Sequence, residues 1–381
     1  MIMNKLLKKF VMALIMTSAL GSTADILAQE YFMYVGTYTS WKEGGKGIYL
    51  YRFDTKSGKI TYVDVTKGIR NPSFLIAGPR GQYLFAVNEM SNDRGAVSSF
   101  HINRPDGSLT EISTQTTGGD DPCHLTLDPE GTTLFTANYT GGNVSVFPVE
   151  EGKKILERSA LIIHEGHGPD ASRQQGPHPH EVVIGPDNLL YVPDLGLDKV
   201  FMYTLRGSRQ PLPADPPYVE TPPGGGPRHL VFSRDGKEMY VLLEMGYALV
   251  HFHCHDPHSP WEKKETVSLL PAGADPTGNT GAELCLSPDG KYLYASNRGH
   301  NSIALFRLGK NGEPVMKGDF PSGGKTPRFF TLDPSGRFLL VLNQDSNNMA
   351  LFKREKDGSL KHTGTDIFVP KPVCAVFVPV K

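Results

Sequence analysis

The chain has 381 residues, of which 21% are charged and 39% hydrophobic, and its formal net charge is -1. This composition excludes a disordered chain, a collagen-like chain and a strongly basic nucleic-acid-binding protein. The 41 glycines and 30 prolines indicate many turns, which favours short strands over long helices. The 4 cysteines are too few for a disulfide scaffold, and we expect buried free thiols.

The N-terminus has the pattern of a secretory signal peptide. Lysines within residues 1–9 precede an apolar run over residues 10–20, and small residues follow as far as Ala24. The run is shorter than the roughly 20 residues that cross a bilayer, so we expect cleavage rather than a retained anchor, after Ala24 or, as a second candidate, after Ala28. Residues 1–24 would then direct export to the periplasm or the cell exterior. Cleavage removes lysines and no acid, so neither a nucleic-acid nor a membrane partner is expected for the mature chain.

One sequence phrase recurs along the rest of the chain. It consists of a proline, a short apolar strand, a turn such as Ser-Pro-Asp-Gly, a second apolar strand and often an asparagine. The copies start at Pro72, Pro122, Pro179, Pro227, Gly281, Pro327 and Pro372. Full copies continue with two more alternating strands. Four strands per unit of about 50 residues are typical of a β-propeller.

The two ends of the chain complement each other. The copy at Pro372 provides only a first strand, whereas residues 31–36 resemble a second strand and residues 47–52 a third. We therefore predict an all-β, seven-bladed propeller over residues 30–381, built of four-stranded blades. Its ring would be closed by N- and C-terminal strands that share one blade, which removes exposed edges. An open array of β units is the alternative, and the complementary ends argue against it.

The repeat also predicts which residues surround the channel. The first strand of each blade lines the channel and starts at the face where the second strand ends, so both sets of residues should meet around one mouth. The first-strand positions hold Ser73, Cys123, His180, Arg228, Ala282, Arg328 and Val373. One position further on are Phe74, His124, Glu181, His229, Glu283, Phe329 and Cys374. The second strands end at Asn88-Glu89, Asn138-Tyr139, Asp194, Glu244, Asn297-Arg298 and Asn343-Gln344.

Arginine, histidine and glutamate gather at this predicted mouth. Burying an unpaired charge is costly, so packing alone gives no reason for three arginines there. One interpretation is that the arginines pair with nearby glutamates and hold the blades together. The interpretation that we prefer is an anion site, because planar guanidinium groups suit carboxylate or phosphate. His180 and Glu244 would be potential proton carriers beside it.

Five phrases follow one another in the chain: Gly176-Pro-His-Pro-His-Glu181, Asp194-Leu-Gly-Leu-Asp-Lys-Val200, Gly226-Pro-Arg-His-Leu-Val-Phe232, Asn297-Arg-Gly-His-Asn-Ser-Ile303 and Asn343-Gln-Asp-Ser-Asn347. Together they resemble the lactonase family of seven-bladed propellers, which includes propeller-type 6-phosphogluconolactonases and, more distantly, the fungal carboxy-muconate cyclases. The resemblance covers essentially the whole mature chain. It implies hydrolysis, or in the cyclases formation, of a sugar or muconate lactone with no bound cofactor.

The resemblance also implies a set of site residues. In the cyclases a His, two Arg and a Glu are proposed to form the site, and the matching positions here are His180, Arg228, Glu244 and Arg298. Glu244 or His180 would activate a water molecule, and the two arginines would hold the substrate anion and polarise the carbonyl. Leu243 departs from the pattern, because other blades carry Asn or Asp there. Further candidates for substrate binding are Arg328, His124, Gln344, Asn138 and His178.

Two histidine clusters remain to be interpreted. Residues 164–167 and 178–180 flank a long loop. For the histidines in these two segments, a role in ordering the loop or in contacting substrate is favoured over metal binding. Residues 251–255 place three histidines on one side of a third strand, which favours a half-exposed strand face over a metal site. No metal site is predicted. The sequence also contains no G-x-S-x-G elbow, H-E-x-x-H motif or Walker loop.

The leading prediction is therefore an exported, cofactor-free hydrolase of an anionic sugar lactone, similar to 6-phosphogluconolactonase. A cycloisomerase of the cyclase type would use the same residues with proton transfer to carbon. A propeller that only binds a ligand or a partner is the third possibility, because propellers are common scaffolds. A closed ring without free edges favours a monomer.

Overall fold

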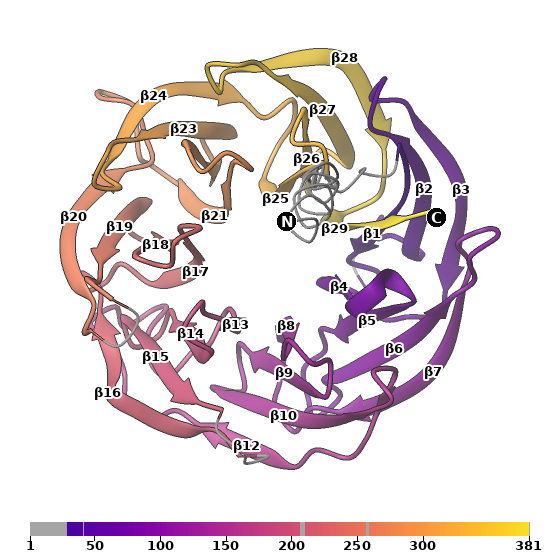
Figure 1. The fold of residues 1–381 in the computed structure, drawn as a ribbon, viewed down its shortest axis with the longest axis horizontal. Helices are drawn as coiled ribbons and strands as arrows, with labels where there is room; N and C mark the ends of the chain where they lie inside the picture. Colours follow the sequence, from indigo (N-terminus) through magenta and orange to yellow (C-terminus); the bar gives the residue numbers. More distant parts are fainter. Residues whose placement is uncertain (1–28, 41, 206–209, 257–258, 381) are drawn as a thin grey trace, which may run out of the picture.

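A computed structural model describes residues 29–40, 42–205, 210–256 and 259–380. Its strands form seven antiparallel sheets around a central channel (Figure 1). This confirms the predicted seven-bladed propeller. The helical structure in the described residues is the 3-10 turn η1 (Pro79–Gly81), and no helix there is long and apolar enough to span a membrane. The predicted signal peptide lies outside the described residues.

Each blade runs outward from the channel in strand order. The innermost strands are β29 (Pro372–Pro379), β4 (Leu75–Ala77), β8 (Pro122–Leu127), β13 (Val183–Ile184), β17 (Pro227–Phe232), β21 (Thr280–Leu286) and β25 (Pro327–Leu332). The second strands are β1 (Glu30–Thr37), β5 (Tyr83–Asn88), β9 (Thr133–Asn138), β14 (Leu189–Asp194), β18 (Glu238–Leu243), β22 (Tyr292–Arg298) and β26 (Phe338–Asn343).

The outer half of each blade has the same plan. The third strands are β2 (Gly47–Asp54), β6 (Ala96–Ile102), β10 (Asn143–Glu150), β15 (Lys199–Thr204), β19 (Ala248–His253), β23 (Ser302–Leu308) and β27 (Asn348–Arg354). The outermost strands are β3 (Ile60–Lys67), β7 (Leu109–Thr116), β12 (Ala160–Ile163), β16 (Leu212–Glu220), β20 (Glu262–Ser268), β24 (Pro314–Pro321) and β28 (Leu360–Phe368). The short β11 (Lys154–Ile155) pairs with the end of β10.

The ring closes as the sequence predicts. β29 pairs antiparallel with β1, with Tyr31 opposite Pro379 and Val35 opposite Ala375. The same sheet continues through β2 and β3, so the C-terminal strand is the innermost strand of a blade begun at the N-terminus (Figure 1). Closure leaves the ring without a free edge between its first and last blades.

The core lies between neighbouring blades rather than at the centre of the ring. Second strands are buried on both faces, and β18 is buried along its whole length. In one cluster Tyr240 and Leu242 of β18 pack with Leu293 and Ala295 of β22. Outermost strands such as β20 are largely exposed and polar. Because inter-blade packing supplies the stability, the channel residues are free to carry polar chemistry.

All four cysteines are free thiols, as expected. Cys123, Cys254 and Cys374 are buried and Cys285 is partly buried. Burial raises the pKa of the Cys123 thiol, which lies at the channel. A thiol with a raised pKa is a poor nucleophile, so the channel cysteine has no reactive character.

Candidate active site at the channel mouth

Backbone irregularities aim the first-strand residues at the mouth. The pairing of the first and second strands shifts register between Pro122 and His124, between Pro227 and His229, and between Pro327 and Phe329. Such bulges leave one residue out of the ladder and redirect its side chain. The residues at these bulges are Cys123, Arg228 and Arg328.

The blade that carries His180 is interrupted at the same place. Its inner strand is reduced to β13, and Pro179 is joined to Asp194 only by an isolated bridge. The backbone N–H of His180 still donates to the carbonyl of Pro193, at 2.9 Å. The sequence predicted an ordinary first strand here. The structure differs here, and the Glu181 side chain turns to the next blade, where Oε2 accepts the Leu230 N–H at 2.7 Å.

A cavity of about 370 Å³ opens at this mouth. It is lined by Tyr38, Glu89, Cys123, Tyr139, Arg173, His180, Glu244, Thr280, Arg298 and Arg328. A larger pocket of about 660 Å³ lies elsewhere on the molecule, but the cavity at the mouth gathers titratable groups from several blades. Convergent polar groups in a concave site are the usual signature of an active site.

Glu244 is the centre of an arginine cluster. Its Oε1 lies 2.7 Å from Nη2 of Arg173, and its Oε2 lies 3.1 Å from Nε of Arg228 and 2.8 Å from Nη2 of Arg298. Burial opposes the charge on Glu244, but the three guanidinium groups outweigh burial and hold its pKa well below the usual range. Glu244 is therefore an ionised anchor and a weak base.

Arg228 lies beneath the cavity rather than in its wall. It is 2% exposed, and Nη1 donates to the carbonyl of Ala282 and lies 3.3 Å from Nε2 of His229. Burial, with Arg298 and Arg328 nearby, lowers the pKa of Arg228 to about 10. It remains a cation at neutral pH, held between Glu244 and the deeper channel.

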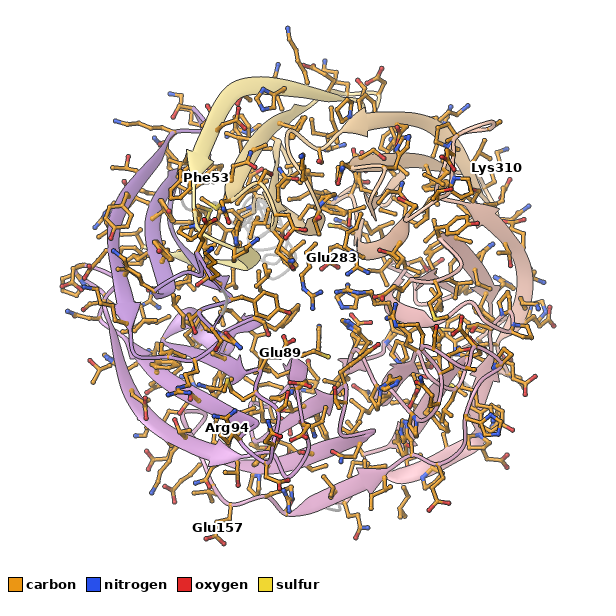
Figure 2. All side chains as sticks on the ribbon, turned by 180° about the vertical axis from the view of Figure 1, so that it is seen from behind. Phe53, Glu89, Arg94, Glu157, Glu283 and Lys310 are labelled. Atoms are coloured by element: carbon orange, nitrogen blue, oxygen red, sulfur yellow. The ribbon has the colours of Figure 1, made fainter. Side chains whose placement is uncertain are left out.

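A His–Glu pair forms the layer below. Nδ1 of His229 lies 3.0 Å from Oε1 of Glu283. Since Nε2 of His229 faces the Arg228 donor, the proton of the neutral ring belongs on Nδ1, which donates to Glu283. Burial raises the pKa of Glu283 to about 7 and lowers that of His229 well below its usual value. Figure 2 shows Glu283 at the inner edge of the ring.

His180 is a neutral imidazole in the cavity wall. It is 5% exposed, and its Nδ1 has no hydrogen-bond partner among the described residues. Its ring contacts the rings of Tyr139 and His229, with centroids 5.5 and 5.2 Å away. Burial and the nearby arginines, Arg228 first, lower the pKa of His180 well below its usual value. A neutral imidazole with an uncommitted nitrogen is able to accept a proton.

The opposite part of the wall is formed by Tyr38, Glu89 and Arg328. The Tyr38 hydroxyl donates to the Glu89 carboxyl, at 2.9 Å from Oε1 and 3.1 Å from Oε2. The Arg328 guanidinium lies over the Tyr38 ring, 5.5 Å from its centroid. Among the described residues Arg328 has no ion pair within 4.0 Å, unlike the other three arginines of the site.

The structure brings together five of the nine residues that the sequence singled out. His180, Glu244, Arg298 and Arg328 line the cavity, and Arg228 contacts Glu244 from below. The other four lie outside the lining: His124, Gln344, Asn138 and His178.

Each of those four side chains has contacts of its own. His124 lies deeper in the channel, with its ring 3.9 Å from that of Phe74. Nε2 of Gln344 lies 3.2 Å from Oδ1 of Asp345. Asn138 is fully buried within its blade. His178 stacks on Tyr139 at the rim, with ring centroids 4.5 Å apart.

The other histidine clusters are held by acids. His164 is buried, with Nδ1 2.6 Å from Oδ2 of Asp194, and so anchors the long loop to the blade. Nε2 of His251 lies 2.7 Å from Oε2 of Glu238, and Nδ1 of His253 lies 2.9 Å from Oε1 of the same residue. His251 is 2% exposed, so the expected half-exposed face is wrong for this residue, because it stacks on Tyr240. No group of three potential ligands occurs in the described part of the chain.

Sequence reasoning missed Tyr38 and Arg173 and left Glu89 and Tyr139 unassigned. Tyr38, Glu89 and Tyr139 each follow the last residue of a second strand, as Glu244 does. The repeat could therefore have identified Tyr38 once β1 was recognised as a second strand. Arg173 comes from the loop between β12 and β13 and has no counterpart in other blades, so no repeat signal marks it.

Leu243 departs from the other blades for a structural reason. The strand-end asparagines are blade anchors: Asn297 and Asn343 donate to the carbonyls of Leu269 and Ser322, at 3.0 Å each. In the blade of Glu244 this position is filled by packing, since Leu243 is 1% exposed. The departure leaves the placement of Glu244 at the mouth unchanged.

Comparison with known proteins agrees with this architecture. The family model described as "Lactonase, 7-bladed beta-propeller" matches residues 32–377. The chain belongs to this family. The match spans all seven blades, from β1 to β29.

Relatives and solved structures match most of the chain. The 6-phosphogluconolactonase of Bacillus subtilis (strain 168) is 32% identical over 304 residues, which cover 79% of this chain and 84% of the relative. The 6-phosphogluconolactonase of Formosa agariphila is 34% identical over 312 residues, 78% of this chain and 85% of the relative. The structure of a periplasmic gluconolactonase from Pseudomonas aeruginosa is 34% identical with a TM-score of 0.86, covering 92% of this chain and 100% of its own.

Proposed function

We propose that this protein hydrolyses an anionic sugar lactone at the channel mouth, as a 6-phosphogluconolactonase or a closely related lactonase. The observation that carries the proposal is the pairing of a neutral imidazole, His180, with three guanidinium groups around one cavity. The lactonase relatives in the same family support the reaction class.

His180 is the better of the two candidate bases. Hydrolysis of a lactone requires removal of a proton from water as it attacks the carbonyl. Both carboxylate oxygens of Glu244 are paired with arginines, so neither is free to accept a proton from water. His180 is neutral and lines the cavity, and no described residue makes a hydrogen bond to its buried Nδ1. The role of Glu244 in this proposal is to position Arg228 and Arg298.

The arginines divide two tasks between them. Arg298 is held by Glu244 and by the Gly281 carbonyl, at 2.8 Å each, which preorganises a donor for the oxyanion that forms on the lactone carbonyl. Arg328 has no ion pair within the described residues and would bind the phosphate or carboxylate of the substrate. The other residues expected from the sequence, His124, Gln344, Asn138 and His178, would act from outside the cavity lining.

The experiment is a hydrolysis assay of the purified protein on 6-phosphogluconolactone, gluconolactone and galactonolactone, read against spontaneous ring opening. We expect acceleration that is lost in His180→Asn. Arg328→Ala should raise KM for the phosphorylated lactone more than for gluconolactone. The exposed Arg234→Ala provides the matched control, and thermal unfolding checks that each variant folds. Failure to accelerate any of the lactones would overturn the proposal and favour the cycloisomerase or a ligand-binding scaffold.

We further propose that the chain is exported and acts as a monomer. The N-terminal pattern of residues 1–24 supports export, and a periplasmic gluconolactonase is among its structural relatives. The C-terminal strand β29 closes the ring within one chain, so no blade has to be completed by a second copy. N-terminal sequencing of protein from the periplasmic fraction should begin at Asp25, and light scattering should give the mass of one chain.

A further inference from the structure

The cavity contains a second carboxyl group that the proposed hydrolysis has not yet used. Glu89 directly follows β5 and lines the cavity together with His180 and Glu244. It occupies the position in its blade that Glu244 occupies in another, one residue after the second strand. Figure 2 shows Glu89 at the inner edge of the ring, toward the channel.

The surroundings of Glu89 and Glu244 differ sharply. Glu244 contacts three arginines within 3.1 Å. Glu89 has no ion pair within 4.0 Å among the described residues, and its carboxyl accepts a hydrogen bond from the neutral hydroxyl of Tyr38. Burial raises the pKa of Glu89, and the positive charge of Arg328 only partly opposes this effect. Two carboxyls whose environments drive their pKa values apart are the usual mark of an acid and an ionised partner.

We propose that Glu89 is the general acid of the site, which protonates the ring oxygen of the lactone as the ester bond breaks. The inference rests on the proposed lactone hydrolysis and adds a catalytic residue to it. Glu89 and the base, His180, line the same cavity from different blades, so one substrate ring can contact both.

The proton balance of the reaction is complete with these two groups. Water forms the new C–O bond to the carbonyl carbon and gives one proton to His180. The bond between the carbonyl carbon and the ring oxygen breaks, and the ring oxygen takes the proton of Glu89 to become a hydroxyl. The products are the hydroxy acid, protonated His180 and ionised Glu89. Return of the proton from His180 to Glu89, through water or solvent, restores the site.

The charged and titratable groups around Glu89 come from several blades. Tyr38 follows β1, Arg328 belongs to β25, and Asp121 and Cys123 lie at the start of β8. Asp121 disfavours a charge on Glu89, whereas Arg328 and the Tyr38 hydroxyl favour it. Cys123 carries no charge at neutral pH because burial raises its pKa. Removal of a neighbour that favours the charged form should therefore raise the pKa of Glu89, and removal of one that disfavours it should lower this pKa.

The test is the pH dependence of lactone hydrolysis in Glu89→Gln, which keeps the side-chain shape and an acceptor for Tyr38 but has no proton to transfer. We expect kcat to fall by roughly 100-fold or more, with KM changed little. The alkaline decline of kcat that reports loss of the Glu89 proton should vanish in the variant. The exposed Glu165→Gln, on the loop beside the mouth, is the matched control and should keep the wild-type profile.

Tyr38→Phe provides a second, graded test. Its hydroxyl stabilises the ionised form of Glu89, so its removal should move the alkaline decline to higher pH without abolishing it. A purely structural role for Glu89 predicts instead a raised KM with an unchanged pH profile. A full alkaline decline in Glu89→Gln would overturn the inference.

Failure of this inference is distinguishable from failure of the proposed function. Wild-type protein that accelerates no lactone contradicts the function itself. Wild-type activity that persists in Glu89→Gln contradicts only the role of Glu89. An infrared difference spectrum between wild type and Glu89→Gln, recorded without substrate, should show that the variant lacks one protonated carboxyl band. A spectrum without this difference would also count against the inference.

Discussion

The carboxylate of Glu244 lies 2.7 Å from the guanidinium of Arg173, although 71 residues separate them in the chain. Arg173 reaches Glu244 from the long loop, whereas the two other arginines approach from blades. The loop is itself held in place: Nε2 of Gln174 donates to Oδ1 of Asp198 at 2.8 Å. The charge cluster around Glu244 thus consists of two arginines from blades and one from the loop.

Arg173→Ala should weaken substrate binding without unfolding the site. Arg173 is partly exposed, so its pairing with Glu244 is partly screened by solvent. We expect KM for an anionic lactone to rise roughly fivefold at low salt, and the difference to shrink as salt increases. Steady-state kinetics at two ionic strengths provide the measurement. An effect on kcat alone, or one independent of salt, would contradict a binding role.

Glu244→Gln should destabilise the fold as well as the activity. The substitution leaves Arg228, which is 2% exposed, without its counter-ion, and such a loss costs about 3–5 kcal/mol. Urea unfolding at neutral pH measures this cost. The double variant Glu244→Gln, Arg228→Met should recover part of it, because the buried charge is then removed as well.

The same residue predicts a pH dependence of stability. The pKa of Glu244 is lowered in the folded state, so its contribution is present above the ordinary value of 4.5 and is lost as pH falls below that value. The stability difference between wild type and Glu244→Gln should therefore shrink in acid. A constant difference between pH 7 and pH 3 would show that Glu244 is not held ionised.

His180→Asn should reduce turnover while the protein still folds. Nδ1 of the imidazole has no hydrogen-bond partner among the described residues, so the loss of stability comes from the ring contacts with Tyr139 and His229. We expect kcat to fall by roughly 100-fold or more. Because the pKa of His180 lies well below 6.5, wild-type activity should persist below that pH. An acid decline of kcat centred near 6.5 would contradict this environment for His180.

Glu283→Gln should change stability in the opposite pH direction. Burial raises the pKa of Glu283 from 4.5 to about 7, so the folded state binds this proton more tightly than the unfolded chain. The contribution of Glu283 to the free energy of unfolding therefore declines as pH rises from 4.5 through 7, and the variant lacks that contribution. Relative to wild type, the variant should gain up to about 3 kcal/mol between pH 5 and pH 8. An equal difference in unfolding free energy between wild type and Glu283→Gln at pH 5 and at pH 8 would contradict this prediction.

Asn138→Ala separates a blade anchor from a binding residue. Nδ2 of Asn138 donates to Asn143 at 2.6 Å and to Ser145 at 2.8 Å inside the blade. Loss of these bonds in a buried site should cost about 1–3 kcal/mol in unfolding free energy, with KM unchanged. A raised KM at full stability would support the substrate contact expected from the sequence.

The repeat made the fold predictable from the chain alone. Each copy combines a turn with apolar strands of period two, and neither signal depends on distant residues. Copies at regular spacing with complementary ends then define a closed ring. The positions of His180, Glu244, Arg298 and Arg328 at the mouth follow from the same repeat, because equivalent residues of each blade lie at equivalent heights in the channel.

The tertiary structure alone decided how these groups share their charges. Which carboxyl is ionised depends on distances between side chains of different blades, and the sequence of a single repeat does not determine these distances. Glu89 and Glu244 occupy equivalent positions, yet one faces Tyr38 and the other three arginines. The loop that brings Arg173 to the mouth is an insertion without a counterpart, so only its folded path places it there. Sequence therefore defined the ring and its mouth, and packing across blades assigned the chemical state of each residue.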